Sequence, residues 1–137
     1  MPSLEADRAA VLFANDAFYT AFSAADMKAM ANCWGAGDAV TCLHPGWEPL
    51  RGRSNVLASW TAILNNPGSP KVQARDALVH VTGDLAWVVC FEALDGGNLI
   101  ATNIFRREEG QWKIVHHQAG PTTAKPSGLE PPTHALQ

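Results

Sequence analysis

The sequence carries little net charge, no cluster of basic residues and no long apolar run. Its 10 Lys and Arg residues stand against 13 Asp and Glu residues, which gives a net charge of −3. Proteins that hold nucleic acid through its phosphates usually present a basic stripe, so no nucleic-acid partner is expected. No apolar stretch approaches the roughly 20 residues that cross a bilayer, so no membrane partner is expected either.

Cysteine is scarce as well. The three cysteines, Cys33, Cys42 and Cys90, are odd in number and widely spaced. This pattern favours reduced, buried thiols over a disulfide framework. Glu5 and Asp7 lie where a signal peptide would carry its basic and apolar segments. A cytoplasmic location is therefore expected.

What the chain does have is a helical first half followed by strands. Apolar residues at three- and four-residue steps predict a helix over 4–23, a shorter one capped by Asp26 and a third capped by Ser54. Strands are predicted at 39–43, 71–82, 85–94, 99–107 and 111–119. Helices followed by a long antiparallel meander predict an α+β fold with the helices on one face of the sheet.

The length predicts one domain, residues 1–121, followed by a tail, residues 122–137. The tail contains Pro126, Pro131 and Pro132 and few residues that could be buried. We expect it to be mobile.

The closing hairpin, residues 102–119, carries two sets of side chains, because successive residues of a strand point to opposite faces. One set is Asn103, Phe105, Arg107, Val115, His117 and Ala119, and the other is Thr102, Ile104, Arg106, Trp112, Ile114, His116 and Gln118. We interpret one face as the wall of a ligand pocket and the other as a contact surface for another subunit. A slip of one residue in register would exchange the two faces.

The strand at 85–94 is apolar on both faces, whereas the helices can cover only one face of the sheet. Leaving the second face in water would expose a large apolar patch, which predicts a homodimer through the sheet face. The alternative is a central strand whose second face is partly covered by the tail.

Several segments together resemble the SnoaL-like and ketosteroid-isomerase-like branch of the nuclear-transport-factor-2-like superfamily. They are residues 18–26 (FYTAFSAAD), 37–45 (GDAVTCLHP), 50–56 (LRGRSNV), 102–105 (TNIF) and 110–117 (GQWKIVHH). The resemblance extends over residues 4–121. It implies a cone-shaped, curved antiparallel sheet wrapped around the N-terminal helices, a cystatin-like α+β barrel with a pocket at its open end. It also implies a dimer through the sheet.

The resemblance implies roles for individual residues. An oxyanion donor two residues before a Phe on the penultimate strand matches Asn103, and the isomerase's catalytic base just before a proline is nearest to His44. Its tyrosine position falls on Phe18, with Tyr19 one residue further along the helix. His117 would then be a second titratable group in the pocket. Because the carboxylate base and second oxyanion donor of the isomerase are absent from the matched positions, steroid isomerisation is not expected.

The predicted pocket therefore has three catalytic candidates and a mostly apolar wall. The catalytic candidates are His44, Asn103 and His117. The wall candidates are Phe18, Tyr19, Trp34, Trp47, Trp87, Val89, Phe105 and Val115. For each histidine the simpler alternative is a side chain held by a neighbouring hydrogen bond, and for Trp47 it is an ordinary surface anchor. His116 and His117 point apart on one strand, so no metal and no cofactor are expected.

These observations predict a protein that binds a small organic molecule in the cone. As an enzyme it would transfer a proton in an apolar carbonyl compound, as an isomerase, cyclase or hydratase does, with His44 as base and Asn103 facing the developing negative charge. The alternative is a non-catalytic, dimerising module for ligand binding or association, because the fold alone does not decide function.

Overall fold

The computed structural model describes residues 3–127 and contains three helices and six strands within that range. The elements, in chain order, are α1 (Leu4–Ser23), α2 (Met27–Cys33), β1 (Thr41–Leu43), β2 (Leu50–Arg51), α3 (Arg53–Asn65), β3 (Gln73–Thr82), β4 (Leu85–Leu94), β5 (Gly97–Glu108) and β6 (Gln111–Pro121). β6 thus ends where the predicted domain ends, and most of the predicted tail lies outside the described residues.

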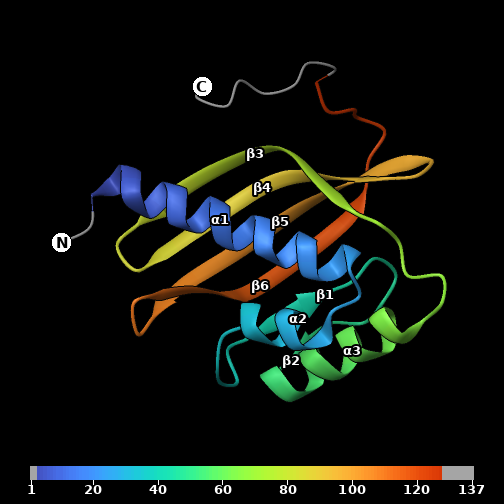
Figure 1. Ribbon diagram of the computed structural model, residues 1–137, viewed down its shortest axis with the longest axis horizontal. Coiled ribbons are helices and arrows are strands. Elements are labelled where there is room, and N and C mark those ends of the chain that lie inside the picture. The colour runs from blue at the N-terminus through green and yellow to red at the C-terminus, as the bar shows by residue number, and fades with distance from the viewer. Residues whose placement is uncertain (1–2, 128–137) are drawn as a thin grey trace.

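The strands form one sheet in the order β2-β1-β6-β5-β4-β3. Figure 1 shows α1 lying across the long strands, with α2, α3 and the short strands β1 and β2 gathered at one end of the sheet. β2 and β3 are free edges, so the curved sheet is open and is not a closed barrel. The predicted α+β architecture is confirmed in this open form.

The helices begin where their capping residues allow, with one difference from prediction. The side chains of Ser3 and Asp26 accept hydrogen bonds from the backbone of α1 and α2, as N-caps do. The predicted cap of α3, Ser54, is instead inside the helix. Gly52 occupies the N-cap position with φ of +88° and no side-chain cap.

One residue of β6 has no partner on β5. Ile104 pairs with His116 and Phe105 pairs with Ile114, so Val115 forms a bulge. Because the bulge adds a residue without changing the face, Ile114 is buried on the same side as His117. The prediction that Ile114, and Trp112 in the same set, face outward is therefore wrong, and Val115 is partly buried against the core.

The interior face of β4 consists of Ala86, Val88, Cys90 and Glu92, all buried. The opposite face carries Trp87, Val89 and Phe91, which lie outside the space between the sheet and α1. The core is completed by α1 and α3, where Phe18 and Trp60 are fully buried with ring centroids 5.4 Å apart. No helix within residues 3–127 has the length and apolar character needed to cross a membrane.

Candidate functional site

Five polar side chains meet in the interior between α1 and the sheet. Asn15 and Tyr19 come from successive turns of α1, Glu92 from β4, Asn103 from β5 and His117 from β6. None of the five is more than 3% exposed. We call this group the interior polar cluster. Polar groups in an apolar core destabilise the fold unless they are hydrogen-bonded, so their partners decide what the cluster can do.

The hydrogen bonds of the cluster form a series in which His117 donates to Asn103, Asn103 to Tyr19 and Tyr19 to Glu92. The Asn103 amide donates to Asn15 Oδ1 at 2.8 Å and to the Tyr19 hydroxyl at 3.1 Å. The Tyr19 hydroxyl donates to Glu92 Oε2 at 2.7 Å. The carbonyl oxygen of Asn103 remains for His117, whose Nδ1 lies 2.5 Å away. His117 therefore carries its proton on Nδ1, and both amide hydrogens of Asn103 are already used.

The two titratable groups of the cluster, Glu92 and His117, have pKa values shifted in opposite directions. Burial raises the pKa of Glu92 to about 7 and lowers the pKa of His117 to about 3, with His44 and His116 lowering the latter further. Glu92 Oε2 lies 3.7 Å from His117 Nε2, close enough for an ion pair if the proton moved to the imidazole. Near neutral pH, a neutral His117 therefore stands beside a carboxyl that is readily protonated.

His44 is buried near the cluster but belongs to a separate set of contacts. The Ser59 hydroxyl donates to the carbonyl of Val56, so it accepts the hydrogen bond from His44 Nε2 at 2.8 Å. The rings of His44 and His117 have centroids 6.4 Å apart. Burial lowers the pKa of His44 to about 4, so it is neutral and only weakly basic near pH 7.

The other predicted wall residues divide into three groups. Phe18, Trp34 and Phe105 are buried in the interior, and Phe18 contacts His117 with ring centroids 5.1 Å apart. Trp47 is 46% exposed and packs its ring edge-on against His44. Trp87 and Val89 lie on the outer face of β4, where Trp87 stacks on His80, and Val115 is in the bulge. Trp87 and Val89 do not line the interior, whereas Val115 is partly buried against the core.

Sequence reasoning missed Asn15 and Glu92. Glu92 stands alone in the apolar strand 85–94, two residues from Cys90 and therefore on the same face. Asn15 lies one helical turn before Tyr19, on the apolar stripe of α1. In both cases, a single polar residue on an otherwise apolar face was the sequence pattern that could have identified the site residue. The family's tyrosine position was matched to Phe18, but the hydroxyl that contacts Asn103 belongs to Tyr19. The Phe18 ring packs beside Tyr19.

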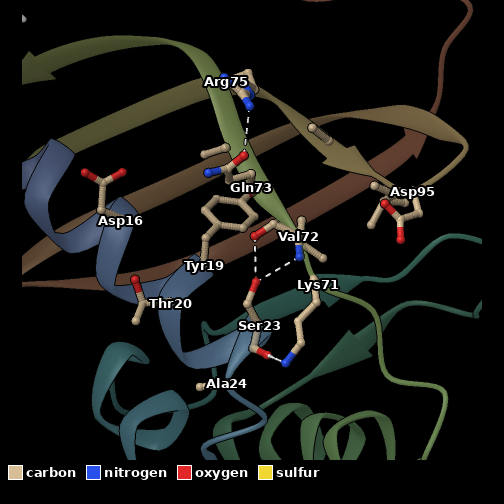
Figure 2. A pocket seen from close by; sticks show the side chains of 13 residues that line it. Asp16, Tyr19, Thr20, Ser23, Ala24, Lys71, Val72, Gln73, Arg75 and Asp95 are labelled. Carbon is tan, nitrogen blue, oxygen red and sulfur yellow. Dashed lines mark hydrogen bonds between the residues drawn. The ribbon is translucent and has the colours of Figure 1, made fainter.

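Residues 3–127 form two surface grooves beside α1. One, of about 980 Å³, lies between the C-terminal half of α1 and the start of β3, and Figure 2 shows the side chains that line it. The other, of about 480 Å³, is a mainly apolar groove between α1, α2 and the β5–β6 turn. His44, Asn103 and His117 line neither groove, whereas Tyr19 forms part of the larger one. Within residues 3–127 no three His, Cys, Asp or Glu side chains gather as metal ligands would.

The SnoaL-like domain is the family model that matches this chain, over residues 11–123. Because the match covers most of the chain, the protein belongs to the SnoaL-like family, as predicted. A structure from Streptomyces avermitilis, described as a candidate dehydratase of the NTF2-like family, is 36% identical with a TM-score of 0.80, covering 89% of this chain and all of that one (100%).

Two further comparisons name other kinds of role. A candidate calcium/calmodulin-dependent protein kinase type II association domain from Thiobacillus denitrificans is 33% identical with a TM-score of 0.74, covering 90% of this chain and 98% of that one. The F-box protein SKIP8 of Arabidopsis thaliana is 30% identical over 112 residues, which cover 80% of this chain and 48% of the relative. The chain thus spans about half the length of this curated relative.

Proposed function

We propose that this SnoaL-like protein binds a small organic molecule and transfers a proton within it, next to a carbonyl group. The observation that carries the proposal is the Glu92 carboxyl, enclosed in the core and hydrogen-bonded by Tyr19 with His117 alongside. A general base or acid works best when its pKa is near the working pH, and burial brings Glu92 to about 7. The resemblance to a candidate dehydratase supports the same class of chemistry.

Each member of the interior polar cluster has a distinct role in this proposal. Glu92 takes the proton from the carbon beside the carbonyl and returns it to the product, so no external reagent is consumed. The Tyr19 hydroxyl donates its one hydrogen to the Glu92 carboxylate, and once Glu92 has taken the proton that hydrogen is free to turn to the negative charge on the carbonyl oxygen. Asn103 has no free amide hydrogen for that oxygen, and it positions Tyr19 and His117. Glu92 suits the role of base better than His44, whose pKa is about 4.

The test is exchange of carbon-bound hydrogen with deuterated water, followed by NMR on a panel of 2-butanone, cyclohexanone and 4-oxopentanoate. We expect at least one compound to exchange faster with the protein present. Glu92→Gln keeps the size and an acceptor for Tyr19 but cannot take a proton, so it should reduce the rate by about 100-fold or more. Glu48→Gln, which changes an exposed carboxylate, is the matched control. Equal rates for the wild type and Glu92→Gln would refute the assignment.

A second candidate function is association through the outer face of the sheet. Leu78, Leu85, Trp87 and Ile100 are exposed on or beside this face. Such apolar residues favour a second protein surface as their cover. The likeness to an association domain also supports this role, and it is compatible with a ligand site in each subunit.

A further inference from the structure

The larger groove has walls from three elements. α1 contributes Asp16, Tyr19, Thr20, Ser23 and Ala24; residues 71–75 contribute Lys71, Val72, Gln73, Ala74 and Arg75; the end of β4 and its turn contribute Ala93, Leu94 and Asp95. In Figure 2 the Tyr19 ring lies in the middle of the groove, with Asp16 to one side along α1 and Lys71 to the other. The groove and the interior polar cluster meet at Tyr19, which belongs to both.

One end of the groove holds an ordered ammonium group. Lys71 Nζ donates to the backbone carbonyl of Ser23, the last residue of α1, at 2.8 Å. The Ser23 hydroxyl also donates to the Val72 carbonyl and accepts from the Val72 amide, which ties this end of α1 to the same segment. An ammonium has three hydrogens to donate, so two remain for a ligand. A carboxylate would be their natural partner.

The other end holds an unpaired carboxylate. Asp16 makes no hydrogen bond or ion pair with any other part of the chain that the structure describes, and partial burial raises its pKa. It stands seven residues before Ser23 on α1, which at 1.5 Å per residue places the two ends of the groove about 10 Å apart. A hydroxyl or ammonium donor is the group that such a carboxylate would bind.

The charges of the groove are balanced. Lys71 and Arg75 are cationic, and Asp16 and Asp95 are anionic. The lining therefore has no net charge that would attract an ion of one sign, whereas a ligand with two opposite charges could pair one with Lys71 and the other with Asp16. Between the ends, the Tyr19 ring, Val72 and Leu94 offer an apolar surface for a short carbon chain.

We propose that this groove binds a small zwitterionic amino acid, with its carboxylate on Lys71, its ammonium group on Asp16 and its carbon chain against Tyr19. The proposal rests on the proposed function, because it names the class of substrate that Tyr19 and Glu92 would act on. It places the substrate beside the C-terminal half of α1, against Tyr19.

The experiment measures binding without requiring turnover. The backbone amide signals of Thr20, Val72 and Leu94 are followed by NMR while 6-aminohexanoate, hexanoate, hexylamine or 1-hexanol is added. We expect 6-aminohexanoate to bind at least threefold more tightly than hexanoate or hexylamine, and 1-hexanol to bind weakest. Lys71→Met should weaken the binding of hexanoate by at least threefold, because it removes the ammonium group. Asp16→Asn should weaken the binding of hexylamine by at least threefold, because it removes the carboxylate. Lys28→Met and Glu5→Gln, both exposed and outside the groove, are the matched controls.

The proposal is overturned if the three signals do not move with any probe, or if the control variants weaken binding as much as the groove variants do. The Glu92→Gln variant tests binding in the groove independently of the proposed proton transfer. If 6-aminohexanoate binds Glu92→Gln as it binds the wild type, the groove site stands whether or not exchange of carbon-bound hydrogen is observed.

Discussion

Glu92 is the residue whose surroundings depart furthest from those that a carboxylate prefers. It is 2% exposed, and its partners are the neutral hydroxyl of Tyr19 and a neutral imidazole. Among residues 3–127 no Lys or Arg forms an ion pair with it, so protonation is the less costly way to keep this carboxyl in the core. The same carboxyl can therefore influence both the chemistry of the site and the stability of the fold.

The free energy of unfolding should depend on pH through the ionisation of Glu92. Its pKa in the folded state is about 7, against an ordinary value of 4.5, so the folded state holds the proton more tightly. This contribution is complete below about pH 4.5 and is lost as the pH rises through 7, at about 1.4 kcal/mol per pKa unit, which amounts to about 3 kcal/mol. Glu92→Gln should gain stability relative to the wild type between pH 5 and 8, as measured by urea unfolding at each pH.

The comparison with Glu92→Gln is needed because two histidines act in the opposite sense. His44 and His117 have folded-state pKa values of about 4 and 3, below the ordinary 6.5, so they stabilise the fold above pH 6.5 and lose that effect on acidification. Both remain in the variant, so the difference in unfolding free energy isolates the carboxyl. A difference that stays constant with pH would contradict a raised pKa for Glu92.

Among the elements, the long helices and strands were predictable, whereas local irregularities were not. The period of the apolar residues fixed α1, α2 and the four long strands within a few residues. The bulge at Val115 and the two-residue strand β2 leave no comparable mark in the sequence. Alternation sorted the hairpin into two sets and the family resemblance chose the inward one. Because burial on β6 depends on the bulge, this placed Asn103 and His117 correctly in the interior and Ile114 incorrectly outside. The position of Glu92 needed the pairing of three strands, which no local pattern encodes.

The start of α3 offers a test of one such irregularity. Gly52 has φ of +88°, and an added Cβ would meet only the Asp38 carboxylate at 3.9 Å, so the cost of a side chain comes from the backbone. Gly52→Ala should lower the unfolding free energy by about 1–3 kcal/mol. Chemical denaturation measures the change. Gly97→Ala, at a glycine with space around it and no positive φ, should change stability little. Equal effects of the two substitutions would show that Gly52 is not conformationally required.

At the scale of the whole molecule, the sheet separates two environments. Its inner face encloses the interior polar cluster beneath α1, and its outer face presents Trp87 at 38% exposure and Ile100 at 37%. The outer residues Trp87 and Ile104 are neighbours across β4 and β5, and Val89 lies two residues along on the same face. This distribution favours the association of two copies with their ligand sites pointing away from each other.

A single charged substitution can test whether the outer face of the sheet is the dimer contact. Trp87→Lys should convert a dimer into a monomer, because an ammonium would be buried without a partner at the contact. Light scattering coupled to gel filtration measures the mass. Phe13→Lys places the same charge on α1, where the phenyl ring is 77% exposed, and should leave the dimer intact. A wild-type protein that stays monomeric at high concentration, or a Trp87→Lys protein that stays dimeric, would contradict this surface.

The chain contains a single tyrosine, and that tyrosine is Tyr19. Its hydroxyl bonds Asn103 and Glu92 while its ring forms part of the larger groove. An isotope or fluorine label introduced through tyrosine therefore reports on one location without further mutagenesis. Its spectrum would respond to groove occupancy, to ionisation of the neighbouring carboxyl and to loss of the surrounding core, so a single resonance can follow recognition, proton movement and unfolding in the same sample.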